Sequence, residues 1–195
     1  MIGIVDYGCG NLKSLENALE ALGLASRRIA LPGEILGEDR VILPGVGNFG
    51  HAGTELDRRG LAEPLKVRAA GGGPILGICL GMQLLFEGSE EAPDQPGLGL
   101  LEGRCELFTD PALKVPHMGW SKVDFGDKSL AAYFVHSYFV PAWPRGRASQ
   151  AIGLTDYGRP FLAAFHSGPL SGFQFHPEKS GVHGLALLKE ALQWS

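Results

Sequence analysis

Cys79 is the residue with the clearest chemical potential, because it lies in Gly77-Ile78-Cys79-Leu80-Gly81 directly after the apolar run Pro74-Ile75-Leu76. A Gly-x-Cys-x-Gly pattern after a strand is typical of a nucleophile elbow, a sharp strand-to-helix turn that lifts the nucleophile above a parallel sheet. Glycines suit the strained backbone and the close helix packing of such a turn. A free cysteine at a strand end can also be a small buried hydrophobe, so the motif alone leaves both interpretations open.

A candidate general base occurs in Phe175-His176-Pro177-Glu178. A thiol attacks as the thiolate, and a neighbouring imidazolium lowers the pKa of a cysteine from ~8.5 to between ~3.5 and ~7.5. Glu178 can orient His176 by accepting a hydrogen bond from its other ring nitrogen. The alternative is an ion pair at the surface. By residue type alone, five other histidines could also serve as the general base. None of them has a carboxylate as close in the sequence as His176 has. They are His51, His117, His136, His166 and His183.

Acyl chemistry on a thiol also needs donors for an oxyanion. The backbone N–H of Leu80 supplies one by the geometry of the elbow. Gly45-Val46-Gly47 offers more backbone donors at the end of a neighbouring predicted strand. The alternative for these two glycines beside Pro44 is an ordinary tight turn.

The order of elements that must position these residues predicts an α/β fold. Short apolar strands alternate with amphipathic helices, which is typical of a parallel sheet covered on both faces. The predicted elements are strands at 2–5, 40–43 and 74–78, and helices from Asn11 to Gly23, over about 52–70 and from Met82 through Phe86. Functional groups should gather at the carboxyl ends of the strands.

After Pro93 the pattern changes to short strand-like runs between turns rich in glycine and proline, at 105–108, 132–135 and 162–165. These runs predict antiparallel, hairpin-connected strands. A last strand is expected at 172–175 and a closing helix at 184–194. The fold class is therefore an open, mostly parallel central sheet with helices on both faces and antiparallel additions in the C-terminal half.

Composition narrows the function. The 195 residues are 45% hydrophobic, which suits one core, and we expect a single domain over 1–195. A net charge of −4 without a basic run gives no footprint for nucleic acid. No membrane span or signal peptide is visible, so a cytoplasmic location is expected. There is no Cys-x-x-Cys spacing among the three cysteines Cys9, Cys79 and Cys105, so no disulfide framework and no thiolate zinc site are expected. A metal site at His176 and Glu178 is not expected either, because no third ligand follows at a recognisable spacing.

Taken together, these residues resemble a known family. The segments 77–83 (Gly-Ile-Cys-Leu-Gly-Met-Gln) and 175–178 resemble the signature of the triad-type (class I) glutamine amidotransferases. Five further segments are similar to the family of glutaminase subunits of imidazole glycerol phosphate synthase, and the similarity spans nearly the whole chain: Asp6-Tyr7-Gly8 with Gly10-Asn11, 44–50, 116–120, 133–138 and 176–180. That family usually has asparagine where Ser121 stands here, which puts one local contact in doubt.

The resemblance implies a role for each site residue. Cys79 would attack the side-chain amide of glutamine, His176 would protonate the leaving ammonia, and Glu178 would orient His176. Val46, Gly47 and Leu80 would form the oxyanion hole. The amino-acid part of glutamine would be held by Gly45, Gln83, Ser137 and Tyr138, with Glu91 receiving the ammonium group; Glu90 fits that last role nearly as well by sequence.

The resemblance also implies a partner and no cofactor. The partner would be a (β/α)8-barrel synthase subunit in a heterodimer, which uses the ammonia to form imidazole glycerol phosphate and an aminoimidazole carboxamide ribotide in histidine biosynthesis. Asn11, Trp120 and Lys179 are the candidates for its interface. Two alternatives remain open, a glutaminase serving a different synthase and a non-enzymatic binding subunit with the same fold.

Overall fold

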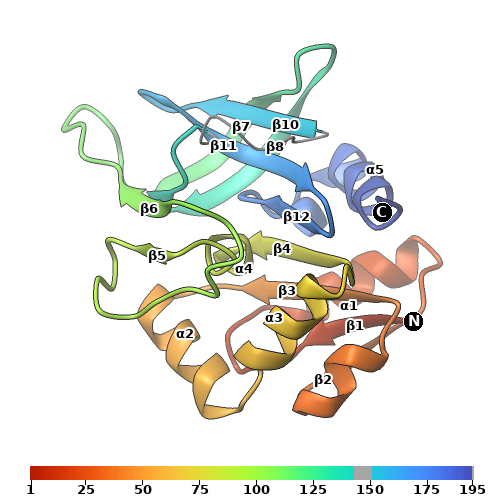
Figure 1. Ribbon diagram of the computed structural model, residues 1–195. Coiled ribbons are helices and arrows are strands. Elements are labelled where there is room, and N and C mark those ends of the chain that lie inside the picture. Colours follow the sequence, from red (N-terminus) through yellow and green to blue (C-terminus); the bar gives the residue numbers. More distant parts are fainter. Residues whose placement is uncertain (143–150, 195) are drawn as a thin grey trace.

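The computed structural model describes residues 1–142 and 151–194 (Figure 1). Within these residues, nine strands form one mixed sheet in the order β2-β1-β3-β4-β12-β11-β10-β7-β8. Five neighbouring strands run parallel: β2 (Ser26–Ile29), β1 (Ile2–Val5), β3 (Arg40–Gly45), β4 (Ile75–Cys79) and β12 (Leu170–Phe173). The carboxyl ends of β3 and β4 lie side by side, with Gly45 opposite Cys79.

The remaining strands of this sheet are antiparallel and lie in the C-terminal half of the chain. They are β11 (Pro160–Ser167), β10 (Ala151–Asp156), β7 (His117–Asp124) and β8 (Ser129–His136). A small second sheet consists of β5 (Gly88–Ser89), β6 (Arg104–Leu107) and β9 (Tyr138–Phe139). The predicted fold class is confirmed, with a parallel half and antiparallel additions.

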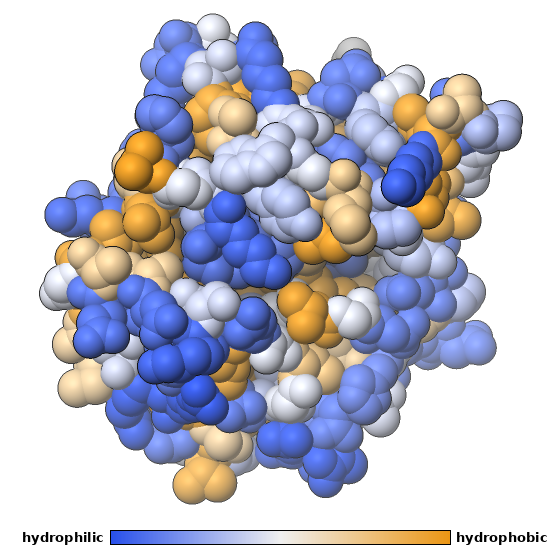
Figure 2. All heavy atoms as spheres, turned by 180° about the vertical axis from the view of Figure 1, so that it is seen from behind, coloured by the Kyte–Doolittle hydropathy of each residue, from blue (hydrophilic) through white to orange (hydrophobic). Residues whose placement is uncertain are grey.

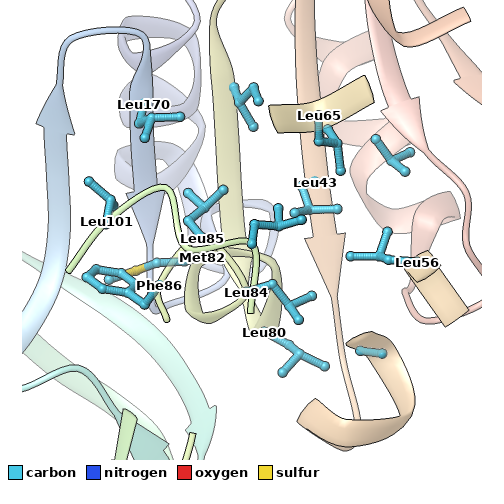
Figure 3. Close-up of a cluster of buried hydrophobic side chains, with 14 of the residues drawn as sticks. Leu43, Leu56, Leu65, Leu80, Met82, Leu84, Leu85, Phe86, Leu101 and Leu170 are labelled. Carbon is cyan, nitrogen blue, oxygen red and sulfur yellow. The ribbon is translucent and has the colours of Figure 1, made fainter. Parts of the chain in front are cut away.

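Helices cover both faces of the parallel half because successive side chains of its strands point to opposite sides. Helices α1 (Leu12–Ala21) and α5 (Gly181–Ala191) pack on one face with Ile4 and Leu76. Helices α2 (Phe49–Arg58) and α3 (Ala62–Ala70) pack on the other face with Leu43 and Ile75. Figure 3 shows the core of that second face, where Leu56 and Leu65 point toward Leu43. The short helices are η1 (Pro32–Gly37), α4 (Leu80–Gln83) and η2 (Pro177–Lys179).

Several predicted boundaries were wrong. The single helix expected over 52–70 is two helices, because Gly60 between them adopts φ +68°, a left-handed conformation that ends a helix. The helix after Cys79 comprises only residues 80–83 before the chain turns. The last strand begins and ends two residues earlier than expected, and the closing helix spans 181–191.

Large apolar side chains are exposed at several places on the surface, among them Met118, Trp120 and Val182. On the face drawn in Figure 2, hydrophilic side chains separate small apolar groups from one another. Among the described helices, none combines the length and the apolar character needed to cross a membrane.

Candidate active site

Cys79 stands on a sharp turn between β4 and α4. Its backbone has φ 54° and ψ −112°, and no other non-glycine residue in the described part of the chain has a positive φ. Such a conformation costs about 1–3 kcal/mol and is maintained only where the surrounding structure enforces it. The strand-to-helix elbow predicted from the glycine pattern is therefore present.

Two glycines make this turn possible. A Cβ added to Gly81 would lie 1.8 Å from the carbonyl oxygen of Leu43, and one added to Gly77 would lie 2.6 Å from Cα of Met82. Real Cβ atoms do not approach other atoms so closely, so neither position accepts a side chain without movement of the backbone. The absence of side chains lets α4 pack directly on β3 and β4, which holds Cys79 in its strained conformation.

His176 and Glu178 form a buried pair beside this turn. Nδ1 of His176 lies 2.8 Å from Oε1 of Glu178, and the two side chains are only 3% and 5% exposed. The backbone of His176 is held by β8, because its N–H donates to the carbonyl of Tyr133. Nε2 of His176 is buried and has no hydrogen-bond partner among the described residues. This burial contradicts the alternative of a surface ion pair.

The electrostatics of His176 link it to both predicted partners. Burial by itself lowers its pKa, but interactions with Cys79 and Glu178 outweigh burial and raise the pKa to about 10. The imidazole is therefore protonated at neutral pH when the thiolate is present. Because this pKa lies above the ordinary value of 6.5, the protonated group stabilises the fold fully below pH 6.5. That stabilisation disappears as the pH rises through about 10.

The competing histidines differ from His176 in their surroundings, and of these only His136 lines the cavity at Cys79. His51 and His183 are exposed, and His166 is buried against Trp194 with a ring-centroid distance of 5.0 Å. His117 and His136 are buried and contact each other through ring nitrogens 3.3 Å apart. Of the histidines that the structure describes, His176 alone is paired with a carboxylate.

Cys79 opens into a cavity of about 220 Å³. Most predicted site residues line it, although His176 and Glu178 do not. The lining also includes His136, which the sequence offered only as a competing base, and Pro116 and Val135, which were quoted only as parts of motifs. The predicted residues in the lining are Val46, Gly47, Cys79, Leu80, Gln83, Glu91, Ser137 and Tyr138. Gly45 lies behind this wall, where a Cβ would come within 2.7 Å of Oη of Tyr7.

The structure brings the predicted oxyanion segment to the nucleophile. Val46 and Gly47 follow the end of β3 and line the same cavity as Cys79 and Leu80. Val46 is exposed and Gly47 adopts φ +101°, so this segment has the backbone freedom of a glycine turn. That this segment supplies an oxyanion donor stays a prediction.

Two polar side chains in the cavity lining are held by hydrogen bonds to the backbone. Oε2 of Glu91 accepts a hydrogen bond from the N–H of Phe49 at the start of α2, at 2.7 Å. Glu90 instead accepts from the N–H of Leu107 and does not line the cavity, so the geometry favours Glu91. Nε2 of Gln83 donates to the carbonyl of Tyr138 at 2.7 Å, which connects α4 to β9.

The three predicted interface residues are exposed on elements that contact η2 or the backbone of His176. Lys179 follows Glu178 in η2, and Asn11 caps α1, which packs against η2. Trp120 is 58% exposed and packs edge-on against Tyr133, the residue whose carbonyl holds His176. A partner bound to these residues would lie next to the segment that carries His176 and Glu178.

Sequence reasoning missed Gln174. It is wholly buried between Phe173 and Phe175, and its Nε2 donates to Sγ of Cys79 at 3.9 Å. A polar amide in an apolar strand was the available signal, because a buried amide requires partners.

Tyr7 was quoted only as part of a motif, yet its buried hydroxyl donates to the carbonyl of Pro44 at 2.7 Å and supports the end of β3.

Replacing Glu178 by Gln should lower the pKa of His176, and with it the turnover of glutamine that the resemblance implies. The glutamine oxygen can still accept from Nδ1, but the negative charge that raises the pKa is lost. We expect turnover to fall about 10²-fold, less than on removal of Cys79, because the nucleophile remains. NMR titration of His176 together with the pH profile of turnover measures both effects; an unchanged pKa would contradict the pairing.

Replacing Gly47 by Ala should reduce turnover without steric clash. No atom lies within 4 Å of the added Cβ, so the effect comes from φ +101°, which alanine disfavours. A peptide that leaves this conformation loses an oxyanion donor, and we expect a loss of up to ~10²–10³-fold. Gly33→Ala is the matched control, because its Cβ also meets nothing within 4 Å and its φ is not positive. Full activity of Gly47→Ala would remove this segment from the site.

Comparisons with known proteins agree with this geometry. The family model described as glutamine amidotransferase class-I matches residues 3–193. The imidazole glycerol phosphate synthase subunit HisH of Symbiobacterium thermophilum is 46% identical, over 96% of this chain and 91% of that protein. The subunit HisH of Rhodopirellula baltica is also 46% identical, over 97% of this chain and 95% of that protein.

Solved structures show the same fold at lower identity. A crystal structure of a glutamine amidotransferase has a TM-score of 0.79 and 21% identity, over 98% of this chain and 97% of that chain. The structure of PurLQS from Thermotoga maritima has a TM-score of 0.75 and 19% identity, over 98% of this chain and 96% of that chain. On the family match and the near full-length relatives, the chain belongs to the class-I glutamine amidotransferase family, in the group of imidazole glycerol phosphate synthase HisH subunits.

Proposed function

We propose that this chain, acting as one domain over residues 1–195, hydrolyses glutamine to glutamate and ammonia and passes the ammonia to a synthase subunit. The observation that carries the proposal is the interaction of the buried His176–Glu178 pair with Cys79, which stands on its strained elbow and lines the cavity. Membership of a family named for glutamine amidotransfer supports the substrate.

In the proposed reaction, the thiolate of Cys79 attacks the side-chain carbonyl carbon of glutamine and forms a tetrahedral oxyanion. The N–H of Leu80 and the Val46–Gly47 segment would stabilise that oxyanion. His176 gives its proton to the departing nitrogen, the C–N bond breaks, and ammonia leaves behind a thioester. Water, deprotonated by His176, then attacks the thioester and releases glutamate with regeneration of the thiol.

The walls of the cavity suit the amino-acid end of glutamine. Glu91 supplies a carboxylate for the ammonium group, held in place by the N–H of Phe49. The segment Ser137–Tyr138 supplies backbone groups for the carboxylate, and Gln83 lies between this segment and Cys79. Both hydrogens of the Gln83 amide are used by protein acceptors, so Gln83 offers a substrate its oxygen.

The proposed partner is a (β/α)8-barrel synthase subunit in a heterodimer, which would use channelled ammonia to form imidazole glycerol phosphate and an aminoimidazole carboxamide ribotide. The names of the relatives support a complex of this kind. Asn11, Trp120 and Lys179 would contact the partner beside the segment that carries His176 and Glu178. A cytoplasmic location remains a prediction.

Ser121, which stands where the family usually has asparagine, has a hydrogen-bond partner for its hydroxyl group. Its Oγ lies 2.8 Å from Nε2 of His117, behind the exposed Trp120. The residue expected to disturb a local contact therefore anchors a buried histidine.

The test is a glutamine-dependent cyclisation assay. It combines the purified chain with the (β/α)8-barrel subunit of an imidazole glycerol phosphate synthase. We expect co-purification, and product formation that depends on glutamine and on this chain. Ammonium alone should support synthesis by the partner. Release of ammonia only with another synthase, such as a guanylate or anthranilate system, would assign the chain to a different pathway, and no release with any partner would favour a binding subunit.

A further inference from the structure

Gln174 is a buried amide placed against the nucleophile. It follows β12 directly and is 0% exposed, and its two polar atoms are both engaged. Its Oε1 accepts from Nε2 of Gln83 at 2.9 Å, and its Nε2 lies 3.9 Å from Sγ of Cys79. A buried amide is costly unless its hydrogen bonds are satisfied, so its orientation is determined by these neighbours.

The direction of these hydrogen bonds follows from one backbone carbonyl. The carbonyl of Tyr138 can only accept, so Gln83 must turn its NH₂ group toward it. The same nitrogen of Gln83 then gives its second hydrogen to Gln174, which must present its oxygen. The NH₂ group of Gln174 is therefore the end that faces the Cys79 sulfur.

A second set of contacts secures the Tyr138 carbonyl from the other side. Nδ1 of His136 lies 2.8 Å from this carbonyl and must donate a hydrogen bond to it. In a neutral His136, the other ring nitrogen, Nε2, then carries no hydrogen. It therefore accepts a hydrogen bond from Nδ1 of His117. Burial lowers the pKa of His136 to about 3 and that of His117 to about 4, so both rings are neutral. Ser121 then donates to Nε2 of His117.

These contacts form one connected network of buried polar groups from β7 to the nucleophile, and each bond in it has a single allowed direction. Ser121, His117 and His136 hold the Tyr138 carbonyl, that carbonyl orients Gln83, and Gln83 orients Gln174. A network in which every member is satisfied keeps its groups in one arrangement.

We propose that Gln174 is a positioning residue for the nucleophile, whose amide N–H is held against Sγ of Cys79 by Gln83 and stabilises the thiolate. The proposal rests on the proposed function, because it assigns a purpose to a thiolate at Cys79. Hydrogen bonds to an ionised acceptor are stronger than those to a neutral one, so this donor favours the thiolate over the thiol.

Other titratable groups also face the sulfur or share its cavity. From the β12–η2 side, His176 interacts with the thiolate directly and Glu178 through His176. Tyr7, at the end of β1, also interacts electrostatically with Cys79. His136, Tyr138 and Glu91 share the cavity wall. A test must therefore change Gln174 alone and leave these groups in place.

The experiment is the pH dependence of the alkylation rate of Cys79 by iodoacetamide, measured by mass spectrometry on the full chain. Gln174→Met removes the donor at similar side-chain length, and we expect the midpoint of the profile to rise by about one pH unit. Phe173→Leu is the control, because it truncates a wholly buried residue of β12 without removing a polar group. Its midpoint should match that of the parent.

The outcomes separate the two claims. An unchanged midpoint in Gln174→Met, or an equal shift in Phe173→Leu, overturns the role of Gln174 while Cys79 remains the nucleophile. If Cys79 in the parent chain is alkylated no faster than Cys9 and Cys105, the proposed function itself fails.

A second measurement, by NMR, does not depend on whether a variant of Gln174 folds. In the parent chain, the NMR signals of the Gln174 amide hydrogens should shift with pH at the midpoint found by alkylation. In Cys79→Ala this step should be absent. A step of equal size in Cys79→Ala, or no step in the parent, contradicts a hydrogen bond from Gln174 to the thiolate.

Discussion

Cys79→Ala should abolish glutamine hydrolysis while leaving ammonium-dependent synthesis by the complex intact. The alanine removes the only thiol at the cavity among the described residues, and no other side chain there can form the thioester. When catalytic residues act together, removing the nucleophile lowers turnover on the order of 10⁶-fold. The measurement is the initial rate of product formation with glutamine and, separately, with ammonium.

The two nitrogen sources serve as each other's control. A variant that fails with both has lost its fold or its partner, and co-purification with the synthase distinguishes these cases. Substantial turnover of glutamine by Cys79→Ala contradicts the assignment of the nucleophile.

His176→Ala should reduce glutamine turnover by ~10²–10⁴-fold, the usual cost of losing a general acid and base. The residue is paired with Glu178 at 2.8 Å, and its other ring nitrogen is buried without a partner among the described residues. Initial rates of ammonia release measure the effect, and ammonium-dependent synthesis should again persist.

Two other histidines provide matched controls for this variant. His183 is exposed and His166 is buried away from the cavity, so replacing either by Ala should change turnover little. His166→Ala is expected to lose some stability through its contact with Trp194, which separates a structural effect from a catalytic one. If His166→Ala loses as much activity as His176→Ala, the proposed triad is wrong.

The features predicted from sequence are those that depend on neighbouring residues. The elbow at Cys79 follows from glycines two positions to either side, and the pairing of His176 with Glu178 needs only a spacing of two. The repeat of leucines from Leu12 to Leu22 predicted α1 because an amphipathic helix has a period of 3.6 residues. Gly60 was an available signal for the break between α2 and α3 that the prediction missed.

Other elements depend on contacts that sequence patterns do not show. Strand β2 is at the edge of the sheet, and its Arg27 and Arg28 pair with Glu38 and Glu16, so the segment lacks the apolar pattern of a buried strand. The orientation of Gln174 is equally hidden, because it depends on Gln83, 91 positions earlier in the chain. Such long-range polar contacts require the three-dimensional structure.

The central claim is that Cys79 is an activated thiolate within a site that recognises glutamine. A thiol-directed diazoketone analogue of glutamine tests it most directly, because reaction requires both the recognition and the nucleophile. Mass spectrometry of the treated chain, bound to its synthase partner, locates the label. Burial raises the pKa of both Cys9 and Cys105, so neither thiol is expected to compete.

We predict one adduct on Cys79, prevented by excess glutamine and by Cys79→Ala. Equal labelling of Cys9, Cys79 and Cys105, or labelling of Cys79 that glutamine does not reduce, would contradict the claim.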